Sequence, residues 1–518
     1  MWHVRVHILL CFLSVRAASS QVSQFVTRNG NTLQREGRPF YFLGANAYYL
    51  MEQAARGDTA TVKALFVTAK QLGMTVVRTW GFFDFPDSLN PAVIQFRPGV
   101  YNERALRALD YMLWQARLSG IRVLIPFVNN WDDYGGMNQY VRWRSELAEA
   151  PSEIPRYSQR DRARTVVGAK GQSYRVALTE HLGHDDFYTD AIIRAWFKSY
   201  LSSLAQRVNT YTGVSYREDP YLFGWELANE PRSSDRSGLM VTGWINEMAA
   251  YLKQVDTNHL VGTGEEGFDT GAGRYTFSFY NNQSWLFDGS AGVSFAMNSA
   301  NSHIDFASIH LYPQSWNLSN AAGNIWISDH ISVAAAFGKP LVVGEFGTLS
   351  QPTSTYDSWL TTALFDGAAG AVIWQLLEGQ RPNDGFGIRC PHDGSVCAVL
   401  QSQATRFNAK SVGGSLPPPP AFSLFQNYPN PCLSGRQAFN GQTTIAYDVP
   451  GAAHVSVELF NSLGEKVATV VDAFQHAGTR KELLDVGSLP SGAYFYRVSI
   501  QPTNGQTASA TKKLVIVK

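Results

Sequence analysis

The sequence predicts an α/β protein: a (β/α)8 TIM barrel followed by a small all-β, immunoglobulin-like sandwich domain. Between residues 40 and 374, apolar strand-like runs alternate with helical segments, and eight such runs can be counted. After residue 420 the runs are short, alternate polar with apolar residues, and are separated by glycine-containing turns. Repeated βα units of this number close into a parallel barrel, whereas short alternating strands form antiparallel sheets.

The barrel elements follow one another in a regular order. The dipeptide Asn29-Gly30 is a turn signal and predicts a hairpin ahead of the barrel. Helices are expected at 61–72, 103–118 and 191–208. The eight strands are expected at 40–46, 75–80, 121–128, 221–230, 259–263, 304–310, 341–345 and 370–374. An open doubly wound sheet is the alternative, but no glycine-rich phosphate loop supports it.

The ends of the chain and its cysteines indicate export. A positive charge, a short apolar run and small residues predict a signal peptide at 1–20. Four consecutive prolines predict a stiff linker at 411–420, between a catalytic domain at 21–410 and a sandwich at 421–518. In an exported protein we expect Cys390 and Cys397 to form a local disulfide, which leaves Cys432 unpaired.

Composition narrows the function. The net charge is +1 and there is no stripe of Lys and Arg, so nothing indicates a nucleic-acid partner. Aromatic residues make up 13% of the chain, including 13 Trp. We expect core packing to account for more than half of them. The remainder offer flat faces on which sugar rings can stack.

Two glutamates stand at the C-terminal ends of predicted strands. Glu230 ends the run YLFGWELANE, and Glu345 ends PLVVGE. A barrel presents its chemistry at the C-terminal ends of its strands, and glycoside hydrolysis needs two carboxylates. Taken singly, each could be a strand-end glutamate in a surface salt bridge. Together they predict a glycosidase, although the sequence does not give the separation that distinguishes retaining from inverting chemistry.

The surrounding motifs resemble glycoside hydrolase family 5. The run WELANEPR at 225–232 looks like its acid/base motif, and VGEFG at 343–347 looks like its nucleophile motif. Further runs resemble the plant- and fungal-type endo-β-1,4-mannanases of that family, at 77–80, 128–140, 184–190 and 304–313. The resemblance covers roughly residues 25–401 and implies no cofactor and no metal.

The resemblance also implies roles around the two carboxylates. Glu345 would be the nucleophile, kept ionised because Arg78 lowers its pKa. Glu230 would be the acid and then the base, with a raised pKa. Asn229 would bind the 2-hydroxyl of the reacting sugar.

Other residues would line the sugar sites. Strand alternation places His310 and Tyr312 on one face, where the family has them beside the acid and the nucleophile respectively. Trp374 would form the floor under the reacting sugar. Arg232 would bind sugar on the leaving-group side, and Trp131 is a weaker candidate, for which loop support is about as good an explanation.

The tail resembles a second family. The runs at 425–431, 459–464 and 489–497 look like the C-terminal sorting domain of type IX secretion. That resemblance implies the type IX secretion machinery as a partner and a secreted or cell-surface location. A carbohydrate-binding or spacer module is the alternative.

We therefore expect a secreted, monomeric endo-β-1,4-mannanase that hydrolyses mannan, galactomannan and glucomannan by a retaining double displacement. A β-1,4-glucanase (cellulase) of the same family would share both glutamates and differ only in sugar contacts. A non-catalytic surface glycan-binding protein is a third possibility, against which the intact carboxylates argue.

Overall fold

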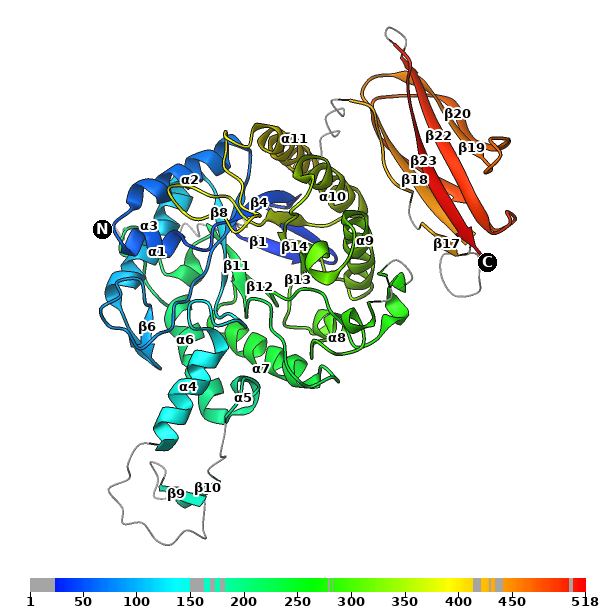
Figure 1. Cartoon of the computed structure of the whole chain (residues 1–518). Coiled ribbons are helices and arrows are strands. Elements are labelled where there is room, and N and C mark those ends of the chain that lie inside the picture. Colours follow the sequence, from blue (N-terminus) through cyan, green and yellow to red (C-terminus); the bar gives the residue numbers. More distant parts are fainter. Residues whose placement is uncertain are drawn as a thin grey trace, which may run out of the picture.

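Figure 1 shows a barrel and a separate sandwich in a computed structural model. The structure describes residues 24–149, 163–167, 173–177, 182–277, 280–281, 283–412, 421–427, 430–433, 441–502 and 506–518. The predicted signal peptide at 1–20 and residues 413–420 of the predicted linker lie outside these ranges. Among the described residues, no helix is long and apolar enough to cross a membrane.

Eight parallel strands form the barrel, in the spatial order β12-β11-β8-β5-β4-β15-β14-β13. A parallel bridge between Gly262 and Phe306 links the two ends of this order. The predicted α/β barrel is thus confirmed, with strands shorter than expected. The strands are β4 (Phe42–Asn46), β5 (Val76–Arg78), β8 (Arg122–Pro126), β11 (Leu222–Glu226), β12 (Leu260–Gly262), β13 (Ala307–Leu311), β14 (Leu341–Phe346) and β15 (Gly370–Ile373).

Helices surround the barrel (Figure 1). Their ends follow capping rules: Asp190 accepts the N–H groups of Ile192 and Ile193, and Gly120 ends a helix at φ 74°. The long helices are α2 (Thr59–Gln71), α3 (Glu103–Ser119), α4 (Gly136–Glu149), α6 (Ala191–Ala205), α7 (Leu239–Val255), α9 (Asn320–Ala336), α10 (Pro352–Asp366) and α11 (Gly394–Ser411). Shorter ones are α1 (Leu50–Ala55), α5 (Asp186–Thr189) and α8 (Phe295–Ala300).

The end of the barrel interior where the strands begin, called the lower end from here on, is apolar. The predicted N-terminal hairpin is present as β1 (Val26–Asn29) and β2 (Thr32–Arg35), followed by the short β3 (Arg38–Pro39). Val26 and Leu33 of this hairpin pack with a layer of buried barrel side chains that includes Phe42, Phe223 and Phe306. Close packing of this kind supplies stability and leaves the opposite end free for polar groups.

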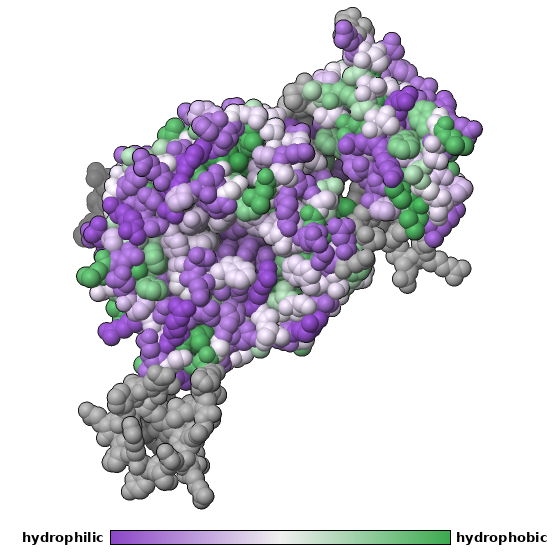
Figure 2. All heavy atoms as spheres, viewed as in Figure 1, coloured by the Kyte–Doolittle hydropathy of each residue, from purple (hydrophilic) through white to green (hydrophobic). Residues whose placement is uncertain are grey.

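Two small two-stranded sheets lie outside the barrel. β6 (Gln95–Arg97) pairs with β7 (Val100–Tyr101), and β9 (Ala163–Val167) pairs with β10 (Ser173–Ala177). Hydrophilic residues cover most of the barrel surface on the face that Figure 2 shows.

The C-terminal domain is a two-sheet β-sandwich, as predicted. One sheet has the order β16-β18-β21 and the other β17-β23-β22-β19-β20. Burial alternates along β19, and Tyr447 of β18 shares a core with Val457 of β19, so the sheets face each other. The strands are β16 (Ser423–Leu424), β17 (Cys432–Leu433), β18 (Gln442–Val449), β19 (Ala453–Phe460), β20 (Lys466–Gln475), β21 (Gly478–Asp485), β22 (Gly492–Pro502) and β23 (Ala508–Val517).

Candidate active site

A groove of about 460 Å³ lies where the strands of the barrel end. Its lining includes Glu230, Glu345, Asn229 and Arg232. Seven aromatic side chains also line it, and such flat faces suit sugar rings. They are Trp80, Trp131, Trp285, Tyr312, Trp316, Trp374 and Phe386.

Glu345 lies deep in this groove, near the end of β14, with only 3% of its surface exposed. Its Oε1 accepts a hydrogen bond from Arg78 Nη1 at 2.7 Å, and its Oε2 accepts one from Tyr312 Oη at 2.6 Å. The preceding residue must be small, because a Cβ at Gly344 would lie 2.8 Å from Ser308 Oγ. The carboxylate is therefore held by two donors in one orientation.

Glu230 lies nearer the rim, in the loop that follows β11. Its Oε2 accepts from Trp131 Nε1 and its Oε1 contacts His310 Nδ1, each at 2.7 Å. Its backbone adopts the left-handed conformation, at φ 53°, and its N–H donates a hydrogen bond to Gly264 O. A non-glycine residue in this region costs about 1 kcal/mol or more and is often found where function fixes a side chain.

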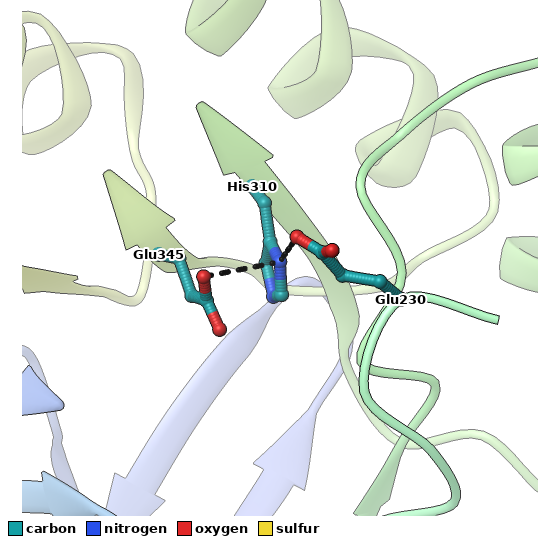
Figure 3. A group of neighbouring side chains, drawn as sticks. All are labelled: Glu230, His310 and Glu345. Atoms are coloured by element: carbon teal, nitrogen blue, oxygen red, sulfur yellow. Dashed lines mark hydrogen bonds and ion pairs between the residues drawn. The ribbon is translucent and has the colours of Figure 1, made fainter. Parts of the chain in front are cut away.

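His310 stands between the two glutamates (Figure 3). Its Nδ1 is 2.7 Å from Glu230 and 3.6 Å from Glu345 Oε2. Carboxylate oxygens of the two glutamates approach each other within 4.8 Å. Retaining glycosidases hold their carboxyl groups about 5–5.5 Å apart and inverting ones roughly 6.5–9.5 Å. Oxygens within 4.8 Å of each other are compatible with the shorter, retaining spacing.

The same three side chains could offer ligand atoms to a metal ion. The guanidinium of Arg78, however, already places a fixed positive charge on Glu345. A cation bound between the carboxylates would be repelled by that charge. The donor set therefore fits proton transfer better than metal binding.

Arg78 organises the floor of the site and is itself fully buried. Besides Glu345, it donates to Glu226 Oε2 at 2.7 Å, Asn46 Oδ1 at 3.0 Å and Asn229 Oδ1 at 2.7 Å. Asn229 in turn donates to Asn129 Oδ1 at 3.0 Å. Glu226 was missed by sequence reasoning, although it lies in the same WELANE run as Glu230.

Trp374 follows β15 and is held on its edge and on one face. Its Nε1 donates to Asp384 Oδ2 at 2.8 Å, and its ring stacks on Tyr48 with centroids 5.4 Å apart. Arg381 donates to Tyr48 Oη at 3.2 Å and pairs with Glu52. Asp384 lies in a loop with no strand or helix pattern, so the sequence offered no signal for it.

Arg232 and Trp131 occupy the other side of the groove. Arg232 makes a bidentate ion pair with Glu266, at 2.6 and 2.7 Å, and lies over the Trp131 and Phe268 rings. Trp131 is 43% exposed and also contacts Glu230 directly. Its place in the site is thus better defined than the sequence indicated.

The pKa directions of the two glutamates differ from the expectation. Burial raises the pKa of Glu345, and His310 and Arg78 do not offset it. Burial also acts to raise the pKa of Glu230, but His310 and Trp131 outweigh it, so its pKa lies below the ordinary value. The expected pattern, with the pKa of Glu230 raised and that of Glu345 lowered, is therefore wrong.

The physical reason lies in His310. Burial lowers its pKa, but Glu345 and Glu230 outweigh this, so its pKa is raised above the ordinary value. Its Nδ1 is closer to Glu230 than to Glu345, which directs the stabilisation to Glu230. Because the three groups interact this closely, proton occupancy belongs to the cluster rather than to any one residue.

A disulfide bond holds the loop that carries Asp384, one of the residues lining the groove. Cys390 and Cys397 form a disulfide, which ties the end of the loop carrying Asp384 to the start of α11. Cys432 is free and buried in the sandwich.

Comparisons with known proteins agree with this geometry. Residues 23–387 match the family described as glycoside hydrolase family 5 beta-mannosidase-like, and residues 426–517 match the secretion system C-terminal sorting domain. Mannan endo-1,4-beta-mannosidase 2 of Oryza sativa subsp. japonica is 36% identical over 77% of this chain and 87% of its own length. Mannan endo-1,4-beta-mannosidase 3 of Arabidopsis thaliana is 35% identical over 70% and 84% respectively.

Solved structures give the same picture. The endo-beta-1,4-mannanase from Thermotoga petrophila superposes with a TM-score of 0.64 at 28% identity, covering 93% of this chain and 99% of its own. The endo-1,4-beta-mannanase from Rhizomucor miehei has a TM-score of 0.61 at 32% identity, covering 73% and 98%.

Proposed function

The chain belongs to the beta-mannosidase-like group of glycoside hydrolase family 5, and we propose that it is a secreted endo-β-1,4-mannanase. It would cleave internal bonds of mannan, galactomannan and glucomannan with retention of configuration. The observation that carries the proposal is the pair Glu230 and Glu345, within 4.8 Å across His310 in an aromatic groove. That spacing is compatible with a covalent intermediate on one carboxylate and proton transfer by the other.

In the first step Glu345 attacks the anomeric carbon. A bond forms between its carboxylate oxygen and that carbon, while the bond to the leaving-group oxygen breaks and that oxygen takes the proton of Glu230. Arg78 and Tyr312 fix the attacking carboxylate through their hydrogen bonds. Holding it in one orientation lowers the entropic part of the barrier.

In the second step water replaces Glu345. Glu230, now a carboxylate, takes a proton from the water, whose oxygen bonds to the anomeric carbon as Glu345 leaves. The two inversions give net retention. The Glu230–His310 contact holds the base towards the reacting centre.

The proposed mechanism starts from ionised Glu345 and protonated Glu230, the distribution that the pKa directions of the two groups disfavour. Two carboxylates this close do not both ionise readily, so a state with Glu345 ionised favours a proton on Glu230. Substrate that displaces water from the groove raises the cost of a second negative charge further. In the proposed reactive state the cluster therefore holds its proton on Glu230.

The remaining lining residues would place the sugars. Trp374 offers a floor under the reacting sugar, and the free N–H of Asn229 can reach a hydroxyl in the groove. Trp131 and Arg232 would contact the leaving-group side. The relatives' printed activity, endo-1,4-β-mannosidase, supports mannan as the polymer.

The tail would direct export. A C-terminal sorting domain indicates outer-membrane secretion or display at the cell surface. We propose that the type IX secretion machinery recognises this domain after a signal peptide at 1–20 has directed the chain across the inner membrane. The catalytic domain is then 21–410, and the prolines at 417–420 separate it from the sandwich.

Substrate and stereochemistry can be tested together. The enzyme is incubated with mannohexaose while proton NMR follows the anomers, and its rates on galactomannan and carboxymethylcellulose are compared. We expect β-anomers to appear first, internal cleavage, and a strong preference for galactomannan. Activity on the cellulose derivative alone would move the assignment to a β-1,4-glucanase, and initial α-anomers would exclude retention.

A further inference from the structure

Arg78 is shared between two buried carboxylates. Its Nη1 donates to the proposed nucleophile Glu345, and its Nε donates to Glu226, both at 2.7 Å. Glu226 is fully buried on β11 and does not line the groove. Its other oxygen accepts from Ser308 Oγ at 3.2 Å. Among the described residues, Arg78 is the charged group that joins Glu226 to Glu345.

One guanidinium facing two anions neutralises neither completely. If Glu345 alone faced Arg78 in this buried setting, the ion pair would hold its carboxylate strongly in the ionised, weakly nucleophilic form. Glu226 competes for the same cation and adds negative charge behind it. Both effects make the carboxylate of Glu345 more basic and hence a better nucleophile.

We propose that Glu226 is a positioning residue which, by sharing Arg78 with Glu345, keeps the Glu345 carboxylate reactive. The proposal relies on the proposed function for the role of Glu345 as nucleophile. Burial raises the pKa of Glu345, and His310 and Arg78 do not offset it; the guanidinium of Arg78 is at the same time hydrogen-bonded to Glu226.

The surroundings of both glutamates show why Glu226 is the informative residue. Glu345 faces Arg78, Glu230, His310 and Tyr312, all of which line the groove or touch groups that do. Glu226 faces Arg78 and Ser308. Changing its charge thus alters the field at Glu345 without altering a side chain that meets the sugar.

The test is the pH dependence of kcat/KM for Glu226→Gln. Gln keeps an acceptor for Arg78 Nε and can donate to Ser308 Oγ, but it carries no charge. We expect the acid limb, which reports the first deprotonation of the cluster formed by Glu345, His310 and Glu230, to move down by about one pH unit, because Arg78 then pairs with Glu345 alone. The plateau should fall several-fold. Ser308→Ala, which removes only a neutral contact, should leave the limb in place.

A purely structural role gives a different result. A lower plateau with an unmoved acid limb in Glu226→Gln would overturn the proposal. Glu226→Asp keeps the charge but draws it away from Arg78, and should move the limb in the same direction by less. If the Gln variant does not fold, an unmoved limb in the Asp variant overturns the proposal equally.

The outcome is separable from that of the proposed function. The profile can be recorded on whichever β-glycan the wild-type enzyme cleaves, so failure on mannan alone leaves this test intact. A readout without turnover is also available in the full chain. Carboxyl carbon-13 NMR, with the Glu345 signal assigned by its loss in Glu345→Gln, should show Glu345 titrating at lower pH in Glu226→Gln than in wild type.

Discussion

The two ends of the barrel interior bury side chains of different kinds, apolar at one end and charged at the other. At the lower end, Phe42, Val76 and Phe223 pack into an apolar layer against the N-terminal hairpin. At the upper end, Arg78 and Glu345 are just as buried but form a charged network. The same strands supply both ends.

Strand geometry explains how this is possible. Along β5, Val76 belongs to the apolar layer, and Arg78, two residues later, belongs to the network. Side chains two apart share a face of a strand, so one inward row passes from apolar to charged within a few ångströms. The lower end supplies packing energy, which allows the upper end to bury charges that would be unfavourable by themselves.

The largest expected effect is a loss of catalytic activity on changing the two glutamates at the upper end. Glu345→Ala and Glu230→Ala should each lower kcat on mannan by about 10⁴-fold or more, because each carboxylate takes part in bond breaking. Mannan binding should be largely retained, as measured by affinity electrophoresis. Survival of turnover in Glu345→Ala would remove the assignment of the nucleophile.

Azide distinguishes the two roles. In Glu345→Ala it should fill the vacated space and give an α-glycosyl azide from an activated substrate. In Glu230→Ala it should attack the covalent intermediate and give a β-glycosyl azide. The reverse pattern would exchange the roles of the two glutamates.

The next effect belongs to the lower end. Phe223→Ala should lower the free energy of unfolding by about 3–5 kcal/mol, since a buried ring that contacts Phe40, Phe42 and Phe306 is removed. The acid limb of the pH profile should not move. Leu118→Ala, on the exposed surface of α3, is the control and should change stability by less than about 0.5 kcal/mol. Denaturant unfolding measures both; equal effects would contradict the layer's role.

The sequence predicted one end of the barrel better than the other. Apolar runs located all eight strands because burial on both faces leaves a strong local pattern. The positions of Arg78 and Glu345 near strand ends followed from that count, whereas Glu230, expected at the end of its strand, lies in the loop after β11. The position of Glu226 did not follow from it, because β11 has an irregular register after Leu222, so the inward face cannot be counted from the strand's end.

What the sequence could not predict depends on distances and loops. The pKa directions follow from His310 lying 2.7 Å from one glutamate and 3.6 Å from the other. Asp384 reaches Trp374 from a loop that has no periodicity to read. Such contacts arise only once the closed barrel has brought distant segments together.

Trp374 offers a smaller test at the upper end. Asp384→Ala removes the acceptor of the indole N–H, so the ring can leave its position on Tyr48. We expect kcat/KM to fall about 10- to 100-fold, the usual range for losing a hydrogen bond to a charged group. Asp384→Asn keeps an acceptor oxygen and should recover most of the loss. Equal losses in both variants would show that the charge, rather than the position of Trp374, matters.

The smallest expected effects concern stability, and they have opposite signs for variants of Glu345 and of Glu230. The folded-state pKa of Glu345 is raised, so wild type loses stability as pH rises from the ordinary carboxyl pKa through the raised one. Glu345→Gln does not titrate, and Arg78 keeps Glu226 as its partner. Its free energy of unfolding should therefore exceed that of wild type at pH 7 by an amount on the order of 1 kcal/mol, and the difference should vanish towards pH 4.

Glu230→Gln is the matched variant. The folded-state pKa of Glu230 is lowered, so its contribution is present above the ordinary carboxyl pKa and is lost as pH falls through the lowered one. Glu230→Gln should melt below wild type at pH 7, with a deficit that shrinks as the pH falls. Melting curves from pH 4 to 8 measure both variants. Shifts of the same sign would mean that His310 does not favour Glu230 over Glu345, and that the difference between 2.7 and 3.6 Å carries no energetic weight.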